Sequence, residues 1–312
     1  SHARPTTVAR MEAITEGCLK AGLEALACGQ PADEAIFRYA LGLLEYRYTR
    51  LSHTAVTLVD HFPRQGTVMT QCFAETIVGT MLREAARRNR PFTRTDLVEK
   101  GRSIVLFPGV EDWFRRINDF GAGQGVQVEH YIISSGLREI IEGSSISGEF
   151  KEIYASEFYY DESGVPVWPQ LAVNFTAKTQ FVYRINKGVL DVSNDRDLNA
   201  SMPDDSKRVP FTSMIYMGDG LSDVPCMKMM RAYGGQAIAV YQASNRAGVE
   251  DLLAKGRVDY IFQADYRAGS ALEATVQDII RKMAVTDRLW EENARQVRSI
   301  GGDVLLGQVG LF

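Results

Sequence analysis

The chain has 312 residues, 45% of them hydrophobic, and a formal net charge of −4. A chain of this length and composition can bury a sizeable core, and we expect one large domain with an insert. The acidic balance argues against nucleic acid or an anionic membrane as the main partner. No apolar run approaches the roughly 18 residues that a membrane span needs. Four cysteines without metal-ligand spacing, and an amino terminus without a secretion pattern, favour reduced thiols in a cytoplasmic protein.

The amino-terminal stretch has helical periodicity. Apolar residues recur at helical spacing over 11–28 and 32–50, on either side of the turn Gly29-Gln30-Pro31, so we predict a helical region over 1–50. Residues 55–59 then form a short β-branched apolar run with Asp60 directly after it. This pattern predicts a strand with an acid at its end, and we expect a small helical cap to be inserted at about 63–102.

Beyond residue 104 predicted strands and helices alternate. We predict strands over 126–133, 153–160, 165–168, 214–217, 237–241 and 258–262, the second and third forming a hairpin. Predicted helices cover 110–120, 137–143, 179–187, 224–231, 246–254, 271–283 and 287–298. The alternation indicates an α/β core over 51–285 with a doubly wound, mostly parallel sheet, followed by a C-terminal helix and tail over 286–312. Ligands in such sheets bind beyond the carboxyl ends of the strands.

The stretch Met214–Asp223 predicts a buried strand that runs into a glycine-flanked turn with two acids, Asp219 and Asp223. Two carboxylates at a strand end suit Mg²⁺, which takes oxygen ligands and keeps several waters. An alternative is a solvated turn with a helix cap, which explains Asp223 but not Asp219 between glycines. A dinucleotide fingerprint is disfavoured, since it needs a third glycine at the position of Asp223, where an acid would repel a pyrophosphate.

Two further strand-end loops carry groups suited to an anion. Ser134, Ser135 and Gly136 follow a predicted strand and precede a helix, where a hydroxyl and free N–H groups can bind phosphate. Ordinary serine capping explains the same pattern equally well. Lys178 stands where a helix begins, and a cation there opposes the helix dipole, so it needs a compensating anion. Bound phosphate would serve, and the alternative is an exposed lysine without a partner.

A serine, a lysine and paired aspartates, each after a strand and in this order, resemble the haloacid dehalogenase-like (HAD) superfamily of phosphotransferases, over about residues 104–283. The resemblance implies that Ser134 binds the transferring phosphoryl group, that Lys178 neutralises it, and that Asp219 and Asp223 bind Mg²⁺. The segments Phe107-Pro108-Gly109-Val110 and Tyr131–Gly136, together with Lys178-Thr179-Gln180, look like a phosphoserine-phosphatase-type branch of that superfamily.

The chain departs from this family in the first motif. The family has Asp-x-Asp-x-Thr after its first strand, where the first aspartate attacks phosphorus and the second shuttles the proton. No Asp-x-Asp occurs before Phe107, and Asp60 is the acid that directly follows a strand-like run. Asp60 is therefore the candidate nucleophile, but Phe62 at the proton-shuttle position cannot transfer a proton. Loss of general acid catalysis typically costs about 10²–10⁴-fold in rate.

These patterns lead to two expectations of different classes. The first is a Mg²⁺-dependent, HAD-like phosphohydrolase that acts on a small phosphorylated metabolite with Asp60 and Lys178 as catalytic residues. The second is a HAD-derived protein without phosphatase activity that keeps the phosphate and metal pocket for binding or regulation. The sequence identifies neither the substrate nor the oligomeric state.

Overall fold

The computed structural model describes residues 5–43, 46, 57, 85, 92–203, 206–242 and 246–301. The chain divides into two compact units, Ser1–Pro91 and Phe92–Phe312. The boundary falls inside the predicted cap at 63–102, and the predicted strand over 55–59 and Asp60 lie outside the described residues, apart from Thr57. Each unit is therefore considered by itself.

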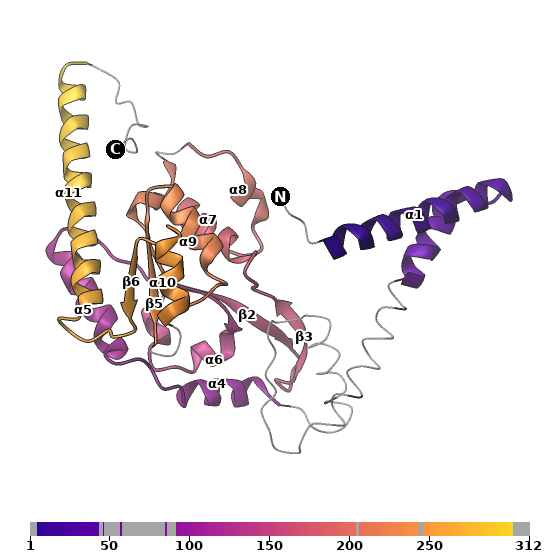
Figure 1. The fold of residues 1–312 in the computed structure, drawn as a ribbon, viewed down its shortest axis with the longest axis horizontal. Coiled ribbons are helices and arrows are strands. Elements are labelled where there is room, and N and C mark those ends of the chain that lie inside the picture. Colours follow the sequence, from indigo (N-terminus) through magenta and orange to yellow (C-terminus); the bar gives the residue numbers. More distant parts are fainter. Residues whose placement is uncertain are drawn as a thin grey trace. The chain divides into compact units, whose positions relative to one another are not determined.

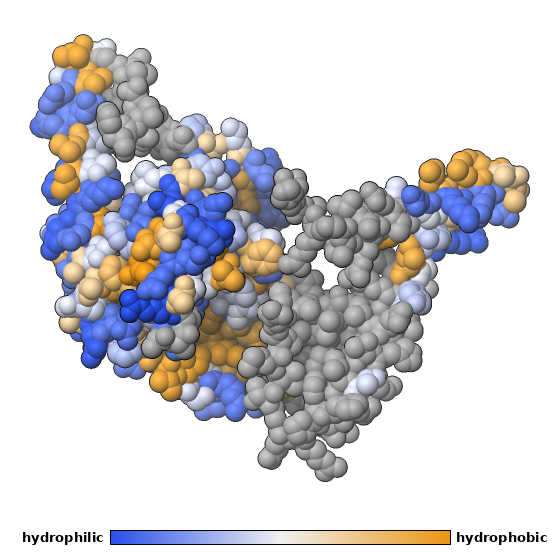
Figure 2. Space-filling view, in the orientation of Figure 1, coloured by the Kyte–Doolittle hydropathy of each residue, from blue (hydrophilic) through white to orange (hydrophobic). Residues whose placement is uncertain are grey.

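The described stretch 5–43 of the first unit forms α1 (Pro5–Ala27) and a second helix over residues 32–43. Proline suits the start of α1, because the first N–H of a helix has no partner within it. The two helices approach closely at Gly17, where an added Cβ would collide with the ring of Tyr39. The apolar side chains expected to form a core stripe are in part exposed, with Leu19, Leu23 and Leu26 all above half, and Figure 2 shows apolar residues on the visible face of α1.

The described strands of the second unit form two three-stranded sheets (Figure 1). In one sheet β1 (Tyr131–Leu137) pairs in parallel with β2 (Glu152–Tyr160), which forms the predicted antiparallel hairpin with β3 (Pro166–Leu171). In the other, β4 (Ile215–Gly218), β5 (Gln236–Tyr241) and β6 (Tyr260–Gln263) are all parallel. The mixed α/β class and the parallel pairing are confirmed. Among the strands described, β1 pairs with β2 alone and β4 with β5 alone.

Helices connect and cover these strands. The second unit contains α4 (Arg94–Arg102), α5 (Val110–Gly123), α6 (Arg138–Glu142), α7 (Lys178–Lys187), α8 (Asp195–Asn199), α9 (Val224–Ala232), α10 (Arg246–Ala254) and α11 (Ala271–Ser299), with 3₁₀ turns at Ser147–Glu149 and Phe211–Ser213. The last part of the predicted cap is α4, which packs on α6 through facing glycines: an added Cβ on Gly101 would lie 2.7 Å from the Cα of Gly143.

The two faces of the β4–β6 sheet belong to different core clusters. Successive side chains of β5 pack into opposite clusters: Ala237 and Ala239 belong to one, and Ile238 and Val240 belong to the other. The first cluster is shared with α7, α9 and the side chains of β1 and β2; the second is shared with α5 and α11. Burial on both faces is what a parallel sheet with helices on each side requires.

One long helix, α11, replaces the two helices predicted over 271–283 and 287–298. The residues between the predicted helices are Ala284, Val285 and Thr286, none of which ends a helix as proline or glycine can. The predicted boundary at 285/286 therefore lies within a continuous helix. Among the described helices, none combines the length and apolar character needed to cross a bilayer.

A cluster of hydrogen-bonded polar side chains lies at the start of β1. The carboxylate of Glu129 accepts hydrogen bonds from Lys151, Arg208 and the hydroxyl of Tyr131, the last at 2.7 Å. Burial acts to raise the pKa of Glu129, but these donors outweigh it and lower the pKa to about 2. The carboxylate therefore joins β1 to the segment that leads into β4 through charge-assisted hydrogen bonds.

Candidate functional site

The centre of the candidate site is a buried ion pair between Lys178 and Asp223. Lys178 is the first residue of α7 and Asp223 immediately precedes α9. The Lys178 Nζ atom donates to Asp223 Oδ1 at 2.7 Å, and each residue is 5% exposed. A second, longer contact of 3.4 Å joins Nζ to Ser222 Oγ. The sequence placed Lys178 correctly at a helix start, and the compensating anion in this structure is Asp223.

The turn before Lys178 holds the lysine in place. Asn174 Oδ1 accepts hydrogen bonds from the backbone N–H groups of Thr176 and Ala177, each at 3.0 Å. This Asx turn organises the chain just ahead of α7, whose own N-cap residue makes no side-chain bond. These hydrogen bonds hold the backbone directly before Lys178 in one conformation.

Gly218 allows Asp223 to reach the lysine. A Cβ added to Gly218, the last residue of β4, would lie 2.7 Å from Asp223 Cγ and 2.8 Å from Asp223 Oδ2. Any side chain at this position would therefore displace the carboxylate. Gly220 has open space around its Cα instead. Of the two glycines beside Asp219, the first serves a close approach by Asp223.

Tyr216 is a third member of this cluster that the sequence patterns did not identify. Its hydroxyl donates to Asp223 Oδ1 at 2.8 Å from within β4. Burial, and then the negative charge of Asp223, raise the pKa of Tyr216 well above its usual range. Burial likewise raises the pKa of the neighbouring Cys226 thiol, to about 11. The sequence identifies Tyr216 only as a residue of a predicted buried strand. Its hydrogen bond to Asp223 forms only when the turn after β4 is folded.

Asp219 differs from Asp223 in its surroundings. It is exposed at the end of β4, close enough for its charge to act on Tyr266. Burial first, and the charge of Asp219 second, raise the pKa of Tyr266 to about 12. The two aspartates predicted as a metal pair are therefore one solvent-facing carboxylate and one engaged in a buried ion pair.

The donor set fits Mg²⁺ in a limited way. Within the described residues there is no group of at least three His, Cys, Asp or Glu side chains placed to hold a metal. Mg²⁺ nevertheless commonly binds through one or two carboxylates, keeping waters and taking further oxygens from substrate phosphates. Asp219 can supply such a ligand, whereas Asp223 already uses Oδ1 for two hydrogen bonds.

The predicted phosphate loop is placed differently from expectation. Ser134, Ser135 and Gly136 lie within β1, and helix α6 begins at Arg138 and is only five residues long. The Ser134 hydroxyl accepts a hydrogen bond of 3.0 Å from the Gly136 N–H, so a local turn rather than a helix N-terminus organises these residues. The strand continues because its register with β2 resumes after an irregularity that spans the two residues after Ser134. In the described part of the chain, no hydrogen bond joins Ser134 to Lys178 or Asp219.

The Phe107-Pro108-Gly109 segment has a packing role near the same strand ends. Gly109 has φ of 82°, and a Cβ there would lie 2.4 Å from the backbone N of Arg267. The N–H of Tyr266 donates to the Pro108 carbonyl at 2.8 Å, and the Phe107 and Tyr266 rings stack. This turn therefore holds the loop that follows β6 against the start of α5.

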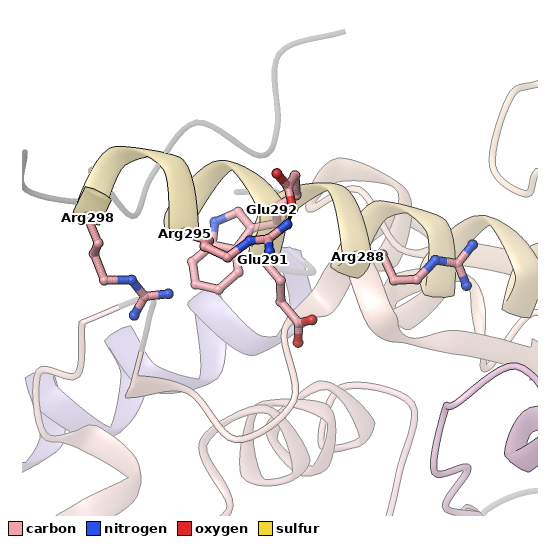
Figure 3. Close-up of a pocket in the computed structure, with 6 residues that line it drawn as sticks. Arg288, Glu291, Glu292, Arg295 and Arg298 are labelled. Carbon is pink, nitrogen blue, oxygen red and sulfur yellow. Dashed lines mark hydrogen bonds and ion pairs between the residues drawn. The ribbon is translucent and has the colours of Figure 1, made fainter. Parts of the chain in front are cut away.

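Among the described residues, those that line a separate surface hollow all belong to α11. Figure 3 shows its side chains along one stretch of that helix, among them Arg288, Glu292 and Arg295. Arg295 forms an ion pair with Glu292 one turn away. A hollow lined by one exposed helix, with charges partly paired to each other, does not have the convergent polar groups of a ligand site.

Comparison with known proteins adds a distant relative. No protein-family model matches the chain. A protein of Borreliella burgdorferi described only as uncharacterized is 26% identical over 197 residues, which cover 56% of this chain and 67% of that protein. The candidate site is thus defined by its own chemistry: a buried Lys178–Asp223–Tyr216 cluster beside an exposed Asp219, at the carboxyl end of β4.

Proposed function

We propose that the chain is a Mg²⁺-dependent phosphohydrolase of the HAD type that acts on a small phosphorylated metabolite. The observation that carries this proposal is the buried pairing of Lys178 with Asp223, beside exposed Asp219, at the carboxyl end of β4. In parallel sheets, ligands bind at the edge formed by the carboxyl ends of the strands. A buried lysine with a fixed stem can bind phosphate as a point charge.

The proposal includes a single doubly wound layer formed by both sheets. Support comes from the first core cluster, in which β1 and β2 side chains share the helices α7 and α9 with β4 and β5. In such a layer, the carboxyl ends of β1 and β4 point to one edge. Ser134 of β1 would then contribute its hydroxyl to the phosphate from one side, and Lys178 its ammonium from the other.

Each residue then has a distinct task. Lys178 neutralises a phosphate oxygen, and Asp223 keeps the ammonium oriented while it does so. Asp219 would hold Mg²⁺, which when bound supplies positive charge that stabilises the phosphate oxygens. Asp60 is the proposed nucleophile, forming a bond to phosphorus as the ester oxygen leaves, and water then hydrolyses the aspartyl-phosphate. Since Phe62 cannot protonate the leaving oxygen, activated esters should react much faster than alkyl esters.

The test is phosphate release from an aryl and an alkyl phosphate with Mg²⁺. We expect turnover of the aryl ester, with Lys178→Ala and Asp60→Asn each abolishing it, and Lys255→Ala as a control that leaves it unchanged. Lys255 is a suitable control because its partner, Asp251, is exposed on α10. Equal turnover in wild type and Asp60→Asn would remove Asp60 from the mechanism.

A second function is favoured by a specific observation. Lys178 already has a full counter-charge in Asp223, and the sequence before Phe107 has no Asp-x-Asp pair. A protein that binds phosphate or a phosphorylated ligand without turning it over would keep Lys178 and Asp219 but need no nucleophile. Phosphate binding by calorimetry, without release from either ester, would select this alternative.

A further inference from the structure

A single carboxylate oxygen organises the candidate site. Asp223 Oδ1 accepts one hydrogen bond from Lys178 Nζ at 2.7 Å and another from the Tyr216 hydroxyl at 2.8 Å. These donors come from α7 and β4, and all three residues are buried. Since the two donors share one acceptor atom, a change in either bond alters the other.

Tyr216 donates to Asp223 from a buried position in β4. A phenol has a single O–H hydrogen, and the Tyr216 hydroxyl directs it to Asp223 Oδ1 at 2.8 Å. Its position is fixed by the strand, because its neighbours Ile215 and Met217 pack on the opposite core cluster. The hydrogen bond from Tyr216 to Asp223 therefore does not depend on the position of the Lys178 ammonium.

This matters when an anion approaches Lys178. An ammonium has three N–H donors, and here it directs one to Asp223 and a weaker one to Ser222. A phosphate that contacts Nζ competes with Asp223 and Ser222 for the positive charge of the ammonium. A buried carboxylate that lost its donor would be costly, but Asp223 keeps the bond from Tyr216.

We propose that Tyr216 is a positioning residue which, through Asp223, sets how tightly Lys178 is held and so how freely it binds phosphate. The inference rests on the proposed function for its ligand, inorganic phosphate or a phosphate ester. Without the phenol oxygen, Asp223 would draw Lys178 closer and would repel a phosphate more strongly. Both effects weaken phosphate binding.

The first experiment needs no ligand. Urea unfolding of the full chain is measured for wild type, Tyr216→Phe, Lys178→Met and the double variant. Because the two donors compensate for each other at Asp223, the double variant should lose about fivefold more in the folding equilibrium constant than the product of the single changes predicts. Tyr154→Phe is the control: it removes another buried hydroxyl, bonded to the Leu190 carbonyl, and should combine multiplicatively with Lys178→Met. A multiplicative result for Tyr216 as well would overturn the inference.

The second experiment measures the affinity for inorganic phosphate by calorimetry. Tyr216→Phe should bind roughly tenfold more weakly than wild type, the size expected for one charge-linked hydrogen bond, while Tyr154→Phe stays within about twofold. Unchanged affinity in Tyr216→Phe, or an equal loss in Tyr154→Phe, would refute the positioning role and leave the proposed function intact. If wild type binds no phosphate although the unfolding experiment shows coupling, the proposed function fails and the control of Lys178 by Tyr216 stands.

Discussion

The substitution Lys178→Met removes one partner of the buried ion pair while keeping an unbranched side chain in the same space. The Lys178 and Asp223 side chains are 6% and 7% exposed, and their charged atoms lie 2.7 Å apart. Removing one partner of such a pair leaves an uncompensated buried charge, which costs about 3–5 kcal/mol. At about 2–4 °C per kcal/mol for a unit of this size, the melting temperature should fall by roughly 10 °C.

The matched control is Lys255→Met, which breaks a lysine–aspartate pair of nearly the same length in a different environment. Lys255 and Asp251 are 2.8 Å apart with side chains 58% and 53% exposed, and an exposed pair is worth about 0.2–1 kcal/mol. Thermal unfolding followed by circular dichroism compares the two variants. Adding Asp223→Asn to Lys178→Met should recover part of the loss, because the neutral amide oxygen can still accept from Tyr216. If Lys178→Met and Lys255→Met lowered the melting temperature equally, the assignment of Lys178 to a buried charge pair would be refuted.

Three other predictions concern single positions. Gly218→Ala should destabilise the protein by about 1–3 kcal/mol through overpacking against Asp223, whereas Gly220→Ala, which meets open space, should change the unfolding free energy little. Mg²⁺ should raise the melting temperature by mass action, and Asp219→Asn should remove most of that rise; an undiminished rise in the variant would contradict Asp219 as a ligand. Glu129, whose folded pKa is lowered to about 2, stabilises the fold above its unfolded pKa of about 4.3, so this stabilisation is lost as pH falls from there through about 2. Acid titration of Glu129→Gln should lack that part of the pH dependence.

Local patterns were sufficient for most elements of the second unit. Between β2 and α10 most predicted strand and helix boundaries agree with the structure within two residues, because alternating apolar runs and turn residues define them locally. The exceptions are β3, which ends three residues beyond its predicted end, and the short helix α8, which was not predicted. The two main failures have different causes. The first strand continues beyond Ile133 because Ser134 pairs with Ala155 of β2 and the register resumes at Leu137, a contact that the local sequence does not show. Helix α11 continues through Ala284 because no residue there stops a helix.

The sequence alone identified the α/β class, the turn with Asp219 and Asp223, and the placement of Lys178 at a helix start, because each depends on residues close together in the chain. It treated the two aspartates as equivalent, and it did not distinguish Tyr216 from its apolar neighbours in β4. Only the tertiary structure separates them: α7 brings Lys178 to Asp223 across 45 positions of sequence, while Asp219 faces solvent. Which carboxylate is paired and which is free depends on burial and on partners from other elements, and these are fixed only when the helices pack on the sheet.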